Sequence, residues 1–111
     1  VRFPGLEGDP SYELSEKYLN GTGGTMVVFG IKGGKDSGQK FIDNLKIIRH
    51  VANVGDTRSL AIHPASTTHY QLDDEALVAA GSPPELVRLS IGIENIEDII
   101  EDLSQAIEST K

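Results

Sequence analysis

The sequence predicts an α+β domain in which helices pack on one side of a small β-sheet. Two apolar runs of strand length, rich in β-branched residues, lie at residues 25–31 and 86–94. Segments whose apolar residues recur at spacings of three and four, the pattern of amphipathic helices, alternate with these runs. A chain of 111 residues can bury one modest hydrophobic core, so a single small domain is expected.

Residues 1–24 are expected to form a connector that contains one short helix, and residues 25–111 form the domain itself. Asp9 or Ser11 can cap the short helix, because their side-chain oxygens accept hydrogen bonds from the free N–H groups of a first helical turn. The pair Asn20-Gly21 is expected to end this helix.

The run at residues 25–31 is continuously apolar, which predicts a buried strand. Two glycines at 33–34 end it, and Asp36 or Ser37 can cap the helix that follows. The residues expected on the inward face of that helix lie at spacings of four and three: Phe41, Leu45 and Ile48.

The second half of the chain predicts a turn at residues 53–56, a short strand at 59–62 and a brief helix at 73–80. The strand at 86–94 follows, and then Asn95 can cap a last helix. The apolar residues of this helix are expected to face inward: Ile96, Ile99, Ile100, Leu103 and Ile107. Its acidic residues are expected to face water: Glu97, Asp98, Glu101 and Asp102.

Composition excludes several classes of function. The formal net charge of −7 argues against nucleic acid or an anionic membrane as the main partner, because both require Lys and Arg to neutralise phosphate. The chain has no cysteine, which excludes disulfides and thiolate metal sites and favours a cytoplasmic protein. It opens at Val1 without an initiator Met, so a processed chain or a piece of a longer one is expected.

The glycine-containing loop at residues 30–37 lies between a strand and a helix, where a phosphate-binding loop would be placed. Its pattern does not fit such a loop, because Asp36 follows Lys35 where Ser or Thr is required, and a carboxylate would repel a phosphate. Ser66 and Ser90 lack the Gly-x-Ser-x-Gly pattern of hydrolase nucleophiles, so no hydrolase triad is supported.

His63 and His69 raise the alternative of a metal site, since Asp73 and Asp74 follow shortly after. They are six residues apart, however, whereas two zinc ligands on one helix are four apart, and Pro64 points to an irregular loop. Structural histidines on a packed loop are the preferred interpretation.

Arg88 is the strongest candidate for a binding residue. Strand alternation places Val87 and Leu89 on one face and Arg88 with Ser90 on the other, so the arginine leaves the core from a rigid element. Its planar guanidinium suits bidentate binding of a carboxylate. From spacing alone, an ordinary surface arginine is the more common case.

A family resemblance strengthens this interpretation. The segments that carry it are Val1-Arg-Phe-Pro-Gly-Leu6, Asn53-Val-Gly-Asp-Thr-Arg-Ser-Leu60, His63-Pro-Ala-Ser-Thr-Thr-His69 and Leu86 to Glu94. In this order they resemble the C-terminal part of the enzymes of cysteine and methionine metabolism that use pyridoxal phosphate, over nearly the whole chain. The resemblance implies the small C-terminal domain of a fold-type I, aminotransferase-like subunit that forms a homotetramer.

Within that family the chain looks most similar to the sulfhydrylase branch, which joins O-acetyl-L-homoserine to sulfide or a thiol. The γ-lyases and cystathionine γ-synthase are the alternatives, and a free-standing, non-catalytic amino-acid-binding module is the alternative from another class. The resemblance implies that Arg88 binds the α-carboxylate of the substrate and that Asn53 donates a hydrogen bond to it. It places Thr68 at the wall of the site, and Ala52 where some γ-lyases carry a glutamate.

The family's cofactor-binding residues are expected in a larger domain that this chain does not match. Glu108-Ser-Thr-Lys111 is similar to the family's lysine motif, but Glu108 stands in place of its first serine, and we interpret the similarity as coincidence. The chain alone is therefore expected neither to bind pyridoxal phosphate covalently nor to turn over substrate.

Overall fold

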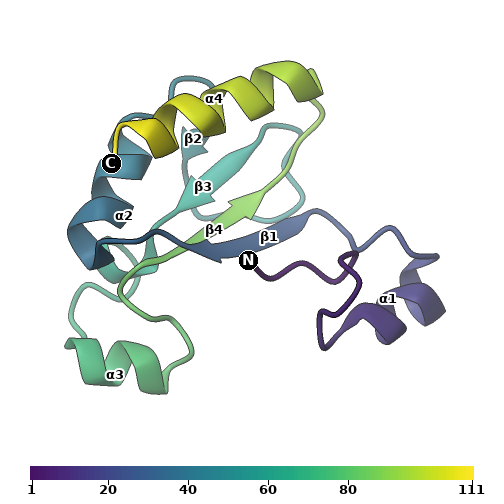
Figure 1. The fold of residues 1–111 in the computed structure, drawn as a ribbon, viewed down its shortest axis with the longest axis horizontal. Helices are drawn as coiled ribbons and strands as arrows, with labels where there is room; N and C mark the ends of the chain where they lie inside the picture. The colour runs from purple at the N-terminus through teal and green to yellow at the C-terminus, as the bar shows by residue number, and fades with distance from the viewer.

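A computed structural model describes residues 1–111, and Figure 1 shows its fold. In chain order the elements are α1 (Tyr12–Leu19), β1 (Met26–Gly30), α2 (Gly34–Asp43), β2 (Arg49–His50), β3 (Leu60–Ile62), the 3-10 helix η1 (Pro64–Ser66), α3 (Asp74–Ala79), β4 (Leu86–Ser90) and α4 (Ile96–Glu108). None of the helices has both the length and the apolar character that crossing a membrane requires.

The sheet has four strands in the order β1-β4-β3-β2. β4 pairs antiparallel with β1 on one side and with β3 on the other, while β2 pairs parallel with β3. β4 is therefore a central strand, whose backbone position is fixed from both sides. The N-terminal segment extends the sheet at its far edge, where Arg2 exchanges backbone hydrogen bonds with Val28 of β1.

The hydrophobic core lies between one face of this sheet and the pair α2 and α4, which lie on the same side of it (Figure 1). β4 contributes Val87 and Leu89, both almost fully buried. Phe29 of β1 packs edge-to-face on Phe41 of α2, with ring centroids 5.5 Å apart. α1 and α3 stand away from this core at the two ends of the sheet (Figure 1). The predicted α+β architecture is confirmed.

Capping explains why three of the helices begin or end where they do. Asn95 accepts a hydrogen bond from the Glu97 N–H at the start of α4, and Asp73 accepts one from the Ala76 N–H at the start of α3. α1 ends at Asn20, which adopts the left-handed conformation with φ of 51°. These three boundaries confirm the sequence-based predictions.

The prediction for α2 was wrong at both ends. The helix begins at Gly34, before the proposed caps Asp36 and Ser37, and it ends at Asp43. The amide of Asn44 donates to the Lys40 carbonyl and satisfies the C-terminal end, so Leu45 and Ile48 lie beyond the helix. Ile48 is nevertheless buried in the core, because the chain turns there into β2, a strand that the sequence did not reveal.

The predicted inward face of α4 was also wrong in part. Ile99 is buried and Leu103 partly so, but the other three isoleucines of the helix are substantially exposed: Ile96, Ile100 and Ile107. Ala106 and Asp102 are buried in their place. Asp102 faces inward because its carboxylate accepts hydrogen bonds from three consecutive backbone N–H groups at residues 46–48.

A second carboxylate, Glu94, joins the segment after β4 to the start of β3. Its two oxygens accept hydrogen bonds from the backbone N–H and the hydroxyl of Ser59, at 2.7 and 2.8 Å, and the Gly92 N–H donates to the same hydroxyl. Burial raises the pKa of Glu94, but the hydrogen bonds from Ser59 outweigh burial and hold that pKa below its usual value. The backbones at positions 57–59 and 92 are in close contact as a result.

This contact predicts a large effect of adding one methyl group. A Cβ at position 92 would stand only 2.6 Å from the backbone nitrogen of Ser59, and closer still to the carbonyl oxygen of Thr57. Because backbone atoms cannot rotate aside, we expect Gly92→Ala to lower the free energy of unfolding by roughly 2–3 kcal/mol. Urea denaturation followed by circular dichroism measures the change.

Gly30→Ala is the matched control. A Cβ there meets only the Glu85 side chain, at 3.1 Å, and Gly30, like Gly92, has no positive φ. We expect a change within about 0.5 kcal/mol for this variant. Equal losses for the two substitutions would contradict the proposed backbone contact.

Candidate functional site

Arg88 lies on the sheet face that turns away from α2 and α4. It pairs with Val28 of β1 and with Ile62 of β3, and residues directly opposite each other in antiparallel strands share a face. Val87 and Leu89, its chain neighbours, face the core. The predicted alternation is confirmed, although Ser90, on the same face as Arg88, is itself buried.

The guanidinium of Arg88 has no partner within the chain. The ion pairs of the structure join Arg2 to Asp9, Arg58 to Asp56 and Lys111 to Glu108, and no side-chain hydrogen bond involves Arg88. The residue is nevertheless half-buried on a central strand. A half-buried cation that lacks a counter-ion is costly, because burial removes part of its hydration without replacing it. Arg88 is therefore well placed for an external anion.

A cavity of about 380 Å³ opens beside the paired strands β3 and β4. Six residues line it: His50, Val51, Ala52, Ile62, Thr67 and Thr68. Ile62 is the direct neighbour of Arg88 across β3 and β4, so the cavity adjoins the arginine although Arg88 does not line it. Its volume falls in the range of small-molecule sites. Thr68 and Ala52, singled out from the sequence, thus meet in one cavity.

Asn53 lies just outside this cavity, one residue after Ala52, and is exposed. Its side-chain oxygen accepts a hydrogen bond from the Val54 N–H at 2.8 Å, while its amide NH₂ group is the donor that helps to hold the pKa of Asp56 down. The same loop is held together by Asp56, whose oxygens accept two hydrogen bonds from the Arg58 guanidinium. These bonds lower the pKa of Asp56 to about 2.

Thr68 is exposed at the rim of the cavity, where its hydroxyl lies 2.8 Å from Nδ1 of His69. His50 also lines this cavity, which no pattern in the sequence indicated. Because β2 has only two residues, its pattern is too short to detect, and its side chains are placed only by the pairing with β3. The other residues that line the cavity lie close to Asn53 or His63 in the chain, in segments already singled out from the sequence.

His63 is fully buried, as expected for a structural histidine. Its Nε2 lies 2.6 Å from the Pro84 carbonyl oxygen and its Nδ1 2.9 Å from the Ser66 hydroxyl, so both ring nitrogens have protein partners. Burial lowers the pKa of His63, and although the Pro84 contact opposes this, the pKa stays below its usual value. The ring is therefore neutral at pH 7.

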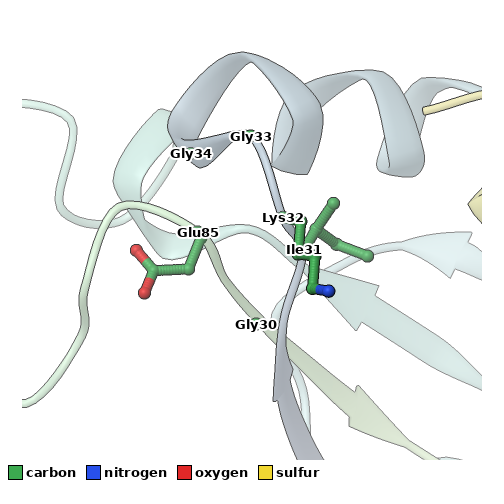
Figure 2. A pocket seen from close by; sticks show the side chains of 6 residues that line it. All are labelled: Gly30, Ile31, Lys32, Gly33, Gly34 and Glu85. Atoms are coloured by element: carbon green, nitrogen blue, oxygen red, sulfur yellow. The ribbon is translucent and has the colours of Figure 1, made fainter. Parts of the chain in front are cut away.

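The glycine loop before α2 forms a separate cavity of about 320 Å³, which Figure 2 shows. Gly33 and Gly34 adopt φ of 109° and 73°, conformations that favour glycine, and so build the sharp entry into the helix. Glu85 lines the cavity and extends away from Lys32 (Figure 2). The turn geometry accounts for these glycines without a bound phosphate.

The chain is similar in sequence to a known family of enzymes. Residues 1–108 match the family model described as Cys/Met metabolism PLP-dependent enzyme. The chain is 50% identical over 107 residues to O-acetyl-L-homoserine sulfhydrylase 1 of Thermus thermophilus, covering 96% of this chain and 25% of that protein. It is 44% identical over 108 residues to L-methionine gamma-lyase of Fusobacterium nucleatum, covering 97% of this chain and 27% of the lyase.

The fold agrees with these matches. The crystal structure of cystathionine gamma-lyase from yeast superimposes with a TM-score of 0.88 at 36% identity, covering 97% of this chain and 28% of the lyase chain. The chain thus spans about a quarter of the length of the relatives that it matches. By sequence and by fold, it belongs to the Cys/Met metabolism family of PLP-dependent enzymes.

Proposed function

We propose that this chain is the substrate-binding, C-terminal portion of a pyridoxal-phosphate-dependent transferase. The complete enzyme would convert O-acetyl-L-homoserine and sulfide, or a thiol, into homocysteine, or methionine, and acetate. In this proposal residues 1–24 connect the portion to the rest of the subunit, and residues 25–111 form its small domain. The observation that carries the proposal is that the half-buried Arg88 has an unpaired guanidinium and lies beside the cavity at Thr68.

Arg88 has the chemistry of a substrate-carboxylate site. Its planar fork donates two parallel hydrogen bonds to a carboxylate, which fixes orientation as well as charge. β4 is held between two neighbouring strands, so the guanidinium projects from a rigid backbone. Holding the α-carboxylate there would orient the substrate's Cα–H bond for deprotonation.

Asn53 and Thr68 are proposed to complete the contacts to the substrate. The NH₂ group of Asn53 can turn from Asp56 to donate to the same carboxylate, and its loop is braced by Asp56 and Arg58. Thr68 would contact the substrate from the cavity rim, since its hydroxyl is exposed there. Neither residue supplies a charge, so specificity for an anionic group rests on Arg88.

Ala52 supports the sulfhydrylase over the related lyases. Its methyl group lines the cavity, and it leaves neither bulk nor charge against an incoming sulfur nucleophile. A glutamate at this position would repel hydrosulfide, the anion formed from hydrogen sulfide near neutral pH.

We also propose that the residues of this chain do not form a pyridoxal phosphate site by themselves. No lysine lines the cavity beside Arg88, so no amine is available there for a Schiff base with the cofactor. We therefore assign the cofactor to other parts of the proposed subunit. The chain's own role is to bind and orient the amino acid.

Product analysis of the complete polypeptide tests this function. With O-acetyl-L-homoserine and sulfide, we expect homocysteine and acetate in equal amounts. A γ-lyase would instead release an α-keto acid and ammonia without any sulfur nucleophile, and a cystathionine synthase would require cysteine as the acceptor. A non-catalytic binding module would bind the amino acid, form no product and show no cofactor absorbance.

The proposed subunit is also expected to assemble as a homotetramer, and sedimentation velocity on the same preparation would test that assembly.

A further inference from the structure

His63 lies at the junction of the segments that present the proposed binding residues. It directly follows Ile62, which lines the cavity, and its carbonyl oxygen accepts a hydrogen bond from the Thr67 hydroxyl at 2.9 Å. The next turn, η1, runs straight into the cavity wall at Thr67 and Thr68. On its other side the ring meets Pro84, four residues before Arg88.

The protonation of the ring follows from its partners. A carbonyl oxygen only accepts, so Nε2 carries the proton and donates it to the Pro84 oxygen at 2.6 Å. In the neutral ring Nδ1 then accepts from the Ser66 hydroxyl at 2.9 Å, a donor that it shares with the His63 carbonyl oxygen at 3.2 Å. One nitrogen holds the turn before the cavity wall, and the other holds the segment that leads into β4.

Close packing leaves the ring little freedom to move. The edge of the imidazole lies against Gly38 of α2, where an added Cβ would stand 2.7 Å from Cδ2 of His63 and closer still to Nε2. The side chain is fully buried, so no water competes for its hydrogen bonds. A rigid ring with one fixed tautomer can set a distance between two segments.

We propose that His63 is a positioning residue of the substrate site, whose imidazole holds the Thr67–Thr68 wall and the segment entering the Arg88 strand at a fixed separation. The inference rests on the proposed function and deepens it, because it names the residue that keeps two walls of the same site in register. His63 itself touches no substrate.

A matched pair of substitutions in the complete enzyme tests the inference. His63→Gln places a donor near the position of Nε2 and can keep the bond to Pro84, whereas His63→Asn places polar atoms near Nδ1 and is too short to reach Pro84. We expect His63→Asn to raise KM for O-acetyl-L-homoserine about tenfold, the effect of losing one buried hydrogen bond. Its kcat should stay within about threefold. His63→Gln should restore KM to within about threefold of the parent enzyme.

Binding measured without turnover provides a second readout. L-Norleucine carries the same α-amino and α-carboxylate groups but no leaving group, so its dissociation constant should rise in parallel with KM. If both variants lower the melting temperature while KM and this constant stay unchanged, His63 is only structural and the proposal is overturned. An equal rise in both variants would also overturn it.

Ser66→Ala keeps the inference testable if His63→Asn does not fold. It removes the partner of Nδ1 and leaves the ring packed against Gly38, so KM should rise about threefold. No rise would overturn the inference. Arg88→Ala separates the two proposals: if it leaves KM unchanged, the proposed function fails, and if it alone raises KM, only the role of His63 fails.

Discussion

Replacing Arg88 by alanine in the complete enzyme is expected to raise KM for O-acetyl-L-homoserine by roughly 100- to 1000-fold. Two charge-assisted hydrogen bonds to a carboxylate would be lost, each contributing about 1.5–2 kcal/mol, and a tenfold change in affinity corresponds to about 1.4 kcal/mol. The arginine has no ion pair within the chain, so its removal leaves no orphaned acid behind. Steady-state kinetics with varied substrate measures the change.

Two controls separate substrate binding from general charge and from folding. Arg88→Lys keeps the charge but loses the planar fork, so it should recover only part of the affinity. Lys40→Ala removes an exposed cation from α2, on the opposite side of the sheet, and should leave KM unchanged. Loss of the cofactor's absorbance in Arg88→Ala, or an unchanged KM, would contradict the assignment.

The orientation of Arg88 was predictable because it depends only on local sequence. Side chains along a strand alternate between faces, so the apolar neighbours Val87 and Leu89 fixed the side on which the arginine emerges. The central place of β4 in the sheet was not predictable in this way. It depends on pairing with the strands that contain Val28 and Ile62, which are distant in the chain. The local sequence does not indicate which strands will pair.

The same distinction explains the errors in α4. Its apolar residues form one stripe along the helix, so periodicity alone could not choose between Ile99, which is buried, and Ile100, which is half-exposed. Asp102 determines which face of the helix is buried, because its carboxylate binds backbone N–H groups that lie 54 to 56 residues earlier in the chain. An acid beside Glu101 in an acidic helix gives no local sign of burial.

The candidate site was partly predictable for a related reason. Thr68 and Ala52 were selected by resemblance, and the structure brings both to one cavity. His50 joins them through a two-residue strand that has no periodicity of its own. His63 was expected to be structural, but its partner Pro84 lies 21 residues away and is visible only in the fold.

Asp102→Ala is expected to lower the free energy of unfolding by roughly 3–5 kcal/mol, enough to unfold many small domains. The carboxylate is 3% exposed and accepts from the backbone N–H groups of Lys46, Ile47 and Ile48 at 2.8 to 2.9 Å. Alanine would leave three donors without a partner where water has little access. Glu101→Ala, which removes an exposed acid from the same helix, should change stability by about 0.5 kcal/mol or less.

The contribution of Asp102 should also depend on pH in a defined direction. Burial raises the pKa of this carboxyl, but the three backbone donors and Gln105 outweigh burial and hold the pKa below its usual value of 3.8. A carboxyl whose pKa is lowered by folding stabilises the fold above its unfolded-state pKa, and that stability is lost as pH falls through the folded-state pKa. Urea denaturation between pH 7 and pH 2.5 should therefore show stability falling below about pH 4, and more steeply in the parent protein than in Asp102→Asn. Parallel curves for the two proteins would show that another carboxylate causes the acid transition, because Asp102→Asn removes this one titration alone.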